Sequence, residues 1–281
     1  MDFEPKNTTF GRCRTCFGSV FFRLCFILMP CMFSSIIADD EPFMMTSSGV
    51  TAIASPYMLY NPASVFAIDS ATFGLMGTPS RFGLSELAEG SVYGIFSPIS
   101  SVRTALNIHG YGNALYAETG LAGTMAFAVT DDMSAGIRAD FQYITIRSFA
   151  SRFAAELDAG MNFRLSPSLR SSIMLTNITR TRRNDTEPQQ MAQCGLGWQT
   201  DSTLCLEADI LLRLQSQSGL LVAASYRPFS ALGLRAAFMT QPQSMELALA
   251  ALPLTKTHIL IATRYTAVLG IMPSFGLQWS P

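Results

Sequence analysis

From about residue 65 to the end of the chain, apolar and polar residues alternate in segments of roughly ten positions. In the segment 133–143, for example, every second residue is apolar, and the residues between them are Ser, Gly, Arg, Asp and Gln. A period of two places alternate side chains on opposite faces of a β-strand. About 9–11 tilted residues suffice to cross the hydrocarbon core of a membrane. The chain is therefore expected to be all-β, with strands of membrane-spanning length.

We predict fourteen such strands, and the connections between them differ at the two ends. Connections after even-numbered strands are mostly short, whereas those after odd-numbered strands include the longest, 77–87 and 179–190. Bacterial outer-membrane barrels have an even number of strands, short periplasmic turns and longer external loops. The pattern therefore predicts a transmembrane antiparallel up-and-down β-barrel whose first strand begins on the periplasmic side. The predicted strands are 65–76, 88–97, 101–110, 120–130, 133–146, 152–165, 168–178, 191–199, 203–214, 219–227, 231–239, 244–252, 256–265 and 269–279.

The last predicted strand carries a continuous apolar face that ends near the chain terminus. This face consists of Ile271, Pro273, Phe275, Leu277 and Trp279. An aromatic residue at the end of the final strand, on the side facing lipid, is typical of outer-membrane barrels. We therefore assign Phe275, Leu277 and Trp279 to barrel closure and assembly, and we expect the last strand to pair with the first.

The composition supports a membrane barrel but also admits an alternative. The sequence is 49% hydrophobic and 14% charged, whereas soluble domains carry about 25% charged residues. Its mean hydropathy is +0.28, yet no apolar run after residue 38 approaches the ~18 residues that a spanning helix needs. A membrane β-barrel and a secreted or periplasmic β-sandwich both fit these values. The formal net charge of −1 gives no reason to expect nucleic acid as a partner.

The first 38 residues have the features of an export signal. Lys6, Arg12 and Arg14 form a basic stretch, an apolar stretch follows at 24–33, and Ser34-Ser35-Ile36-Ile37-Ala38 comes next, before the acidic residues 39–41. We expect cleavage after Ala38 and a location in the bacterial outer membrane. The predicted organisation is a signal peptide at 1–38, an N-terminal plug or periplasmic segment at 39–63, and a transmembrane β-barrel at 64–281.

Charged residues on the polar strand faces would face the lumen of such a barrel. There, arginines and carboxylates are expected to pair and to stiffen the wall. The predicted lumen-lining charges are Arg138, Asp140, Arg152, Glu156, Asp158, Arg164, Glu207, Asp209, Arg213 and Arg235.

No catalytic constellation is recognisable, and we expect neither an enzyme nor a cofactor. His109 and His258 fall on polar faces near opposite rims, so a shared metal site is not expected. Cys194 and Cys205 flank a turn but lie on opposite faces of their hairpin. Their sulfurs then point apart, so free thiols are expected rather than a disulfide.

Two stretches resemble a known family. Tyr60-Asn61-Pro62-Ala63-Ser64, just before the first strand, resembles the N-P-A motif at the start of FadL-type outer-membrane barrels and of the related PorV/PorQ group. The closing segment, from His258 to Trp279 with Leu269-Gly270 opening the last strand, resembles the closing hairpin of PorV/PorQ-like proteins. The resemblance implies a fourteen-stranded barrel whose N-terminal segment folds into the lumen. Asn61, Pro62 and Ala63 would then be the plug motif.

The resemblance leaves two functions open. A PorV/PorQ-like protein would be an accessory or structural component of protein secretion or surface assembly, and this is the first expectation. A FadL-like protein would be a channel for hydrophobic or small solutes. The expected partners are outer-membrane lipid and the barrel-assembly machinery, together with secretion-system proteins or a hydrophobic solute. The chain leaves little length for external loops, which argues against a high-affinity ligand site built on long loops.

Overall fold

The computed structural model describes residues 43–149, 151–181, 189–201, 203–214, 216–254, 256–267 and 269–281. The predicted signal peptide and residues 39–42 of the predicted plug lie outside this part of the chain. No helix among the described residues is long and apolar enough to cross a membrane.

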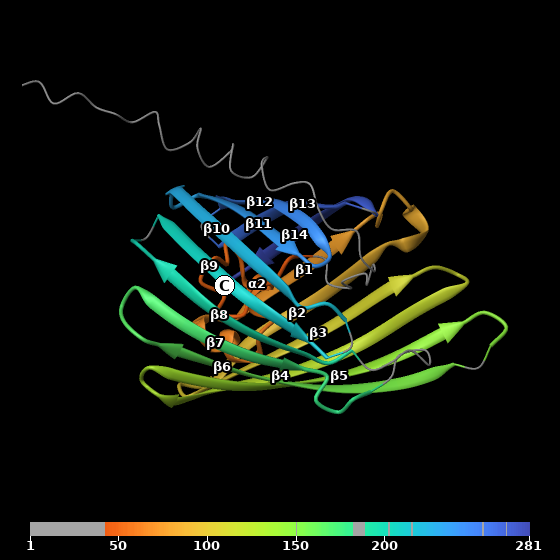
Figure 1. Ribbon diagram of the computed structural model, residues 1–281, viewed down its shortest axis with the longest axis horizontal. Helices are drawn as coiled ribbons and strands as arrows, with labels where there is room; N and C mark the ends of the chain where they lie inside the picture. Colours follow the sequence, from red (N-terminus) through yellow and green to blue (C-terminus); the bar gives the residue numbers. More distant parts are fainter. Residues whose placement is uncertain are drawn as a thin grey trace, which may run out of the picture. The chain divides into compact units, whose positions relative to one another are not determined.

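Fourteen strands close into one barrel (Figure 1). Each strand pairs antiparallel with its neighbours in sequence, and the last strand pairs with the first. This confirms the predicted barrel and rules out the β-sandwich alternative, because the sheet has no free edge. The strands are β1 (Thr72–Thr78), β2 (Glu89–Ile99), β3 (Val102–Gly112), β4 (Tyr116–Thr130), β5 (Met133–Ile146), β6 (Arg152–Arg164), β7 (Leu169–Thr176), β8 (Met191–Gln199), β9 (Leu204–Arg213), β10 (Gly219–Phe229), β11 (Leu232–Thr240), β12 (Gln243–Leu254), β13 (Thr257–Thr266) and β14 (Gly270–Trp279).

The outer face of the barrel is apolar, as the alternation predicts. On β14, Phe275 and Trp279 are 46% and 48% exposed, whereas Ser274 and Gln278, on the opposite face of the strand, point into the lumen and are buried. Large apolar side chains are exposed in the same way on the other strands. A belt of this kind around a closed barrel is covered by lipid in a membrane.

The seam between β1 and β14 contains the residues assigned to closure. Phe275 pairs opposite Gly77, Leu277 opposite Leu75, and Trp279 opposite Phe73. The rings of Phe73 and Trp279 stack on the outer face, with centroids 5.9 Å apart. These three residues therefore lie at the seam where the last strand pairs with the first.

The two rims differ as predicted. One rim carries tight turns such as 100–101 and 131–132. At the same rim, the N-terminal segment leads into the start of β1, and β14 ends. The opposite rim carries the longest connections, 79–88 and 177–190, together with shorter ones such as 241–242. By the usual arrangement of outer-membrane barrels, the rim of tight turns faces the periplasm.

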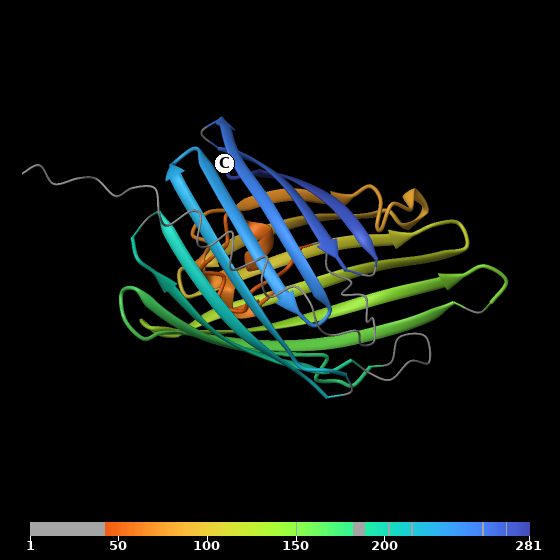
Figure 2. The ribbon, with the colours of Figure 1, turned by 45° about the horizontal axis from the view of Figure 1, so that its top comes forward.

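The first strand begins later than the alternation predicts. It was expected from residue 65, but β1 begins at Thr72. Residues Ser55–Met58 form the short helix α2, and Pro62–Ala67 form the 3-10 helix η1. Val65 and Ile68 are buried inside the barrel. In the predicted strand 65–76, apolar side chains would instead have pointed outward to lipid. We call residues 43–71 the plug; Figure 2 shows it in orange inside the barrel.

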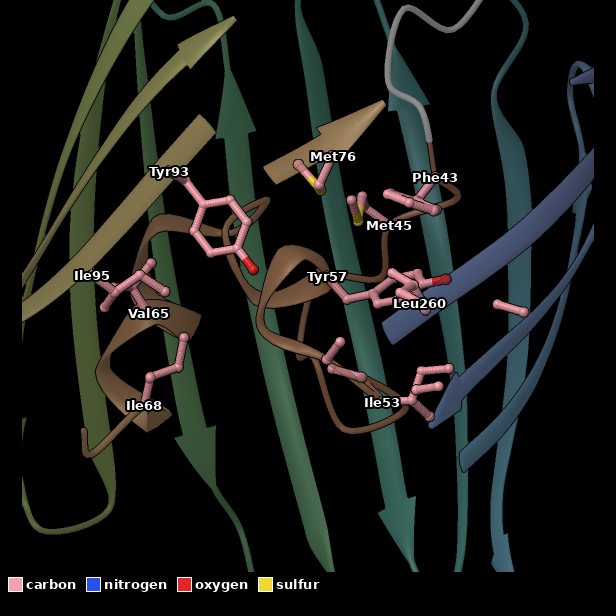
Figure 3. Close-up of a cluster of buried hydrophobic side chains, with 14 of the residues drawn as sticks. Phe43, Met45, Ile53, Tyr57, Val65, Ile68, Met76, Tyr93, Ile95 and Leu260 are labelled. Carbon is pink, nitrogen blue, oxygen red and sulfur yellow. The ribbon is translucent and has the colours of Figure 1, made fainter. Parts of the chain in front are cut away.

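The plug brings an apolar core into the lumen. Phe43 and Tyr57 pack against each other, with ring centroids 5.2 Å apart. Around them, Val65 and Ile68 belong to one buried cluster with wall residues (Figure 3). The labelled wall residues of this cluster are Met76, Tyr93, Ile95 and Leu260. The lumen wall was predicted to be lined with paired charges. It also carries apolar residues, because these cover the apolar side chains of the plug.

Candidate functional site

The Asn61-Pro62-Ala63 motif rests on two glycines that lie directly opposite each other in the wall. Gly136 of β5 pairs with Gly160 of β6. A Cβ atom on Gly160 would overlap Asn61 Oδ1, and one on Gly136 would overlap the carbonyl group of Pro62. We call this pair the glycine seat. Only the two missing side chains allow the plug backbone to approach the wall so closely.

Asn61 is fully buried and bonds in three directions. Its Oδ1 accepts the Ala63 N–H at 3.0 Å, which starts η1 with Pro62 in the first turn. Its Nδ2 donates to Ser47 O at 2.6 Å and to Asn162 Oδ1 of β6 at 3.2 Å. Asn61 therefore ties both halves of the plug to each other and to the wall.

A second seat holds the first half of the plug. On β8, Gly195 and Gly197 lie opposite Asp209 and Glu207 of β9. A Cβ atom on Gly195 would collide with Asp209 Oδ1 and with Ser47 Oγ of the plug, and one on Gly197 would collide with the side chains of Ser48 and Val50. We call these four residues the carboxylate seat.

The carboxylates of this seat accept hydrogen bonds from the plug backbone. Glu207 accepts the Ser48 N–H at 2.7 Å and the Thr51 N–H at 3.3 Å, and both hydroxyls as well. Asp209 accepts the Ser47 N–H at 2.6 Å. Among the described residues, neither carboxylate forms an ion pair with an arginine. The expected Arg–carboxylate wall is therefore wrong at Glu207 and Asp209, because these groups compensate unpaired N–H groups of a non-helical plug instead.

A third contact joins the plug to Glu246 of β12. Glu246 accepts the Met44 N–H at 2.6 Å, the Tyr57 hydroxyl at 3.2 Å and Arg235 Nη1 at 2.5 Å. Arg235 also donates to Met44 O at 2.8 Å and lies 4.5 Å from the Tyr57 ring centroid. All four residues are buried. The prediction placed Arg235 in the lumen but did not include Glu246 among the site residues.

Arg264 of β13 contrasts with Arg235. It lies directly opposite Glu246 in the sheet and is 3% exposed. Its Nε and Nη2 have no hydrogen-bond partner among the described residues. Glu246 is already occupied by Arg235 and the plug.

The remaining predicted lumen charges fall into two groups. Arg138 and Asp158 form the expected cross-strand pair at 2.8 Å, and Asp140 and Glu156 lie opposite each other on the lumen face of β5 and β6. The other three lie at strand ends rather than inside the lumen. Arg164 approaches Asp132 of a periplasmic turn, Arg213 donates to Gln241 O in a loop, and Arg152 is exposed at the start of β6.

The other chemical predictions concern cysteine, histidine and metals. Cys194 and Cys205 are free thiols, as predicted. His109 approaches Asp140 at 3.9 Å, whereas His258 begins β13 at the other rim. In the described part of the chain, no group of three or more His, Cys, Asp or Glu residues could hold a metal ion.

Sequence reasoning missed the glycines, although a signal for them exists. Gly136, Gly160, Gly195 and Gly197 all occupy polar-face positions of clear strands. Aligning the predicted strands 133–146 and 152–165 about their turn would have placed Gly136 opposite Asn162, two positions from its observed partner Gly160. A pair of glycines on one lumen-facing position indicates close approach of another backbone.

Comparison with known proteins identifies the fold. The sequence matches no protein-family model and no curated protein sequence. The structure is similar to the toluene transporter TbuX of Ralstonia pickettii, with a TM-score of 0.63 and 11% identity over 84% of this chain and 96% of that one. It is also similar to the toluene transporter TodX of Pseudomonas putida, with a TM-score of 0.60 and 10% identity over 83% and 93%. A FadL homologue of Pseudomonas aeruginosa gives a TM-score of 0.51 and 10% identity over 84% and 97%.

The chain therefore has the fourteen-stranded fold of FadL-type outer-membrane barrels. This confirms the FadL-type part of the resemblance. The narrower assignment to the PorV/PorQ group stays a prediction.

Proposed function

We propose that the protein is an outer-membrane channel for small hydrophobic solutes, closed by its plug. The observation that carries this proposal is the way the plug is held. It is folded into the lumen and held against the wall by side-chain contacts and hydrogen bonds, notably at the glycine seat, the carboxylate seat and Glu246. Contacts of this kind can be released without breaking the barrel. Transport by the similarly folded TbuX and TodX gives the proposal further support.

The strength of the contacts implies that the closed state dominates. Hydrogen bonds to charged groups contribute about 1.5–3 kcal/mol each, and the plug N–H groups form several with Glu207, Asp209 and Glu246. The apolar cluster around Phe43 and Tyr57 adds to this. Passage of a solute then needs movement of part of the plug, which a few side chains control.

Residues 43–52 are the part of the plug that we expect to move. They bond mainly to carboxylates of β9 and β12. The later part is anchored by Asn61 in the glycine seat and by Arg103, which donates to Ile68 O at 3.0 Å. Because the later part continues directly into β1, it is also tied covalently to the wall close by.

A second candidate is the PorV/PorQ-like role in protein secretion or surface assembly. The packing depth of the plug favours it, since Phe43, Asn61, Ala63 and Val65 are 0% exposed. A lumen filled in this way suits a barrel whose outer surface or rim, rather than its lumen, does the work.

Deletion of the gene separates the two candidates. The channel proposal expects slower uptake of radiolabelled toluene, with unchanged secreted and surface proteins, and restoration of uptake by the plasmid-borne gene. Unchanged uptake together with altered secreted or surface proteins would overturn the channel proposal in favour of the accessory role.

A further inference from the structure

Four buried acceptor oxygens lie on one part of the lumen wall. The plug contacts described above do not involve this part. The four oxygens are Ser91 Oγ of β2, Asn107 Oδ1 of β3, and Asp140 Oδ1 and Gln142 Oε1 of β5. None has a hydrogen-bond partner among the described residues. With His109 of β3, we call these residues the acceptor cluster. Buried oxygens without a donor destabilise a protein, so such a group is expected to meet donors from outside the chain.

The register of the strands brings these side chains around two small residues of β4. Asn107 and Asp140 flank Ala122, one from each neighbouring strand, and His109 and Gln142 flank Gly120 in the same way. The His109 ring lies over Gly120, where a Cβ atom would collide with it. The side chains of Asn107, His109, Asp140 and Gln142 thus lie on both sides of the same short stretch of β4.

The contacts within the cluster leave its acceptors free. Gln142 is 3% exposed, and its Nε2 donates to Asp140 Oδ2 at 3.3 Å. This bond fixes the amide so that Oε1 remains without a donor. His109 Nε2 is 3.9 Å from Asp140 Oδ1, too far for a hydrogen bond.

The charges around the cluster favour a cation. Asp140 carries a carboxylate, and Glu156 lies directly opposite it on β6. Arg138, the arginine of β5 two positions from Asp140, is paired with Asp158. The carboxylate of Asp140 would repel a solute with a carboxylate head.

We propose that the acceptor cluster binds the primary ammonium group of a small amphipathic amine in the lumen. An ammonium group has three N–H donors and no acceptor. Asp140 Oδ1, Asn107 Oδ1 and Gln142 Oε1 supply three acceptors, and Asp140 supplies the countercharge. The apolar part of the amine is directed toward the side of Gln142 where Ile144 and Ala154 adjoin it on the lumen face. The inference rests on the proposed function only in requiring that solutes enter the lumen.

The test measures binding to the full-length protein in detergent by isothermal titration calorimetry. The probes are n-butylammonium, 1-butanol and butanoate, which share one apolar chain and differ in the head group. We expect one butylammonium ion per barrel, with butanol and butanoate at least tenfold weaker. Asp140→Asn and Asn107→Leu should each weaken butylammonium binding at least tenfold. Glu86→Gln, which removes an exposed carboxylate from the connection 79–88, should change it less than twofold.

Equal binding of butanol and butylammonium, or an unchanged affinity in Asp140→Asn, would overturn the assignment. Absence of measurable binding of all three probes would also overturn it and would leave a hydrated polar patch only. These outcomes are separable from failure of the channel proposal. Toluene uptake that depends on the gene, combined with no butylammonium binding, refutes the amine site alone, and bound butylammonium with gene-independent uptake refutes the channel alone.

Discussion

Gly136 of β5 and Gly160 of β6 lie directly opposite each other, and together they make the space that Asn61 and Pro62 of the plug occupy. The motif and its seat are separated by more than seventy residues in sequence. The position of the plug is therefore determined by two small wall residues as much as by the motif itself.

Gly160→Ala should loosen the plug. The new methyl group would overlap Asn61 Oδ1, and Asn61 cannot shift without losing its bonds to Ser47, Asn162 and Ala63. Overpacking of this kind costs about 1–3 kcal/mol. The urea midpoint of the folded, faster-migrating form on a gel should fall.

Gly123→Ala is the matched control for this change. Gly123 lies within β4, and a Cβ there would find its nearest neighbour, Leu106 Cδ2, at 3.9 Å. The urea midpoint of Gly123→Ala should equal that of the wild type. An equal fall of the urea midpoint in both variants would mean that any glycine replaced within a strand lowers the stability, and that the glycine seat has no special role.

Asn61→Ala should release the first half of the plug while leaving the barrel intact. The change removes the hydrogen bonds of Asn61 to Ser47, Asn162 and Ala63, each worth about 0.5–1.5 kcal/mol, and Ser47 O keeps only the longer bond from Ser64 Oγ at 3.3 Å. Hydrogen exchange at the Ser47 and Ser48 amides should become faster by roughly ten- to a hundredfold. Asn113→Ala, in an exposed loop, is the control, and an equal rate at residues 47–48 in both variants would contradict the anchoring role.

Glu207→Gln should weaken the plug at the carboxylate seat. Glutamine retains one acceptor oxygen but lacks the charge that strengthens the bonds to Ser48 and Thr51. We expect more frequent open events in planar-bilayer recordings than for the wild type. Asp201→Asn, which alters a carboxylate in the exposed turn 200–203, should leave the recordings unchanged. Identical recordings for all three proteins would refute a role of this seat in closure.

Arg235 and Arg264 should respond oppositely to replacement by Met. Arg235→Met leaves Glu246 buried without its cation and should cost about 3–5 kcal/mol. Arg264→Met removes a buried guanidinium whose Nε and Nη2 have no partner, and stability should stay equal or rise. The urea midpoints of the two variants measure the difference, and similar losses in both would disprove the distinction.

Trp279→Ala should impair assembly. Trp279 stacks on Phe73 across the seam that joins the ends of the sheet. The fraction of protein in the folded, heat-modifiable band of outer-membrane preparations should fall. Trp198→Ala is the control, because Trp198 is similarly exposed on the outer face but lies on β8, far from the seam. Normal folding of Trp279→Ala would contradict the closing role.

The strands were predictable because the lipid-facing side chains of each obey one simple rule. From β3 to β14, predicted and observed bounds differ by a few residues at most, since an apolar outer face needs every second position. Residues 65–71 were wrongly predicted to be part of the first strand, because Val65 and Ile68 pack in the core inside the barrel and follow no period of two. The partners of Glu207 and Asp209 could not be predicted from the sequence either. Both carboxylates accept hydrogen bonds from backbone N–H groups of the plug, and almost every residue type has a backbone N–H group.

Locking the plug to the wall tests the central claim most directly. Ser47 Oγ lies 2.5 Å from Ser172 Oγ of β7, so cysteines at these two positions can form a disulfide in a background with Cys194 and Cys205 replaced by Ser. The wall-to-wall pair Thr78 and Ser274, whose hydroxyl oxygens are 2.9 Å apart, provides the matched control disulfide. We predict that oxidation of Ser47→Cys/Ser172→Cys stops toluene uptake, that reduction restores it, and that the control pair transports equally in both states. Equal uptake by the plug-locked protein before and after reduction would contradict a channel closed by its plug.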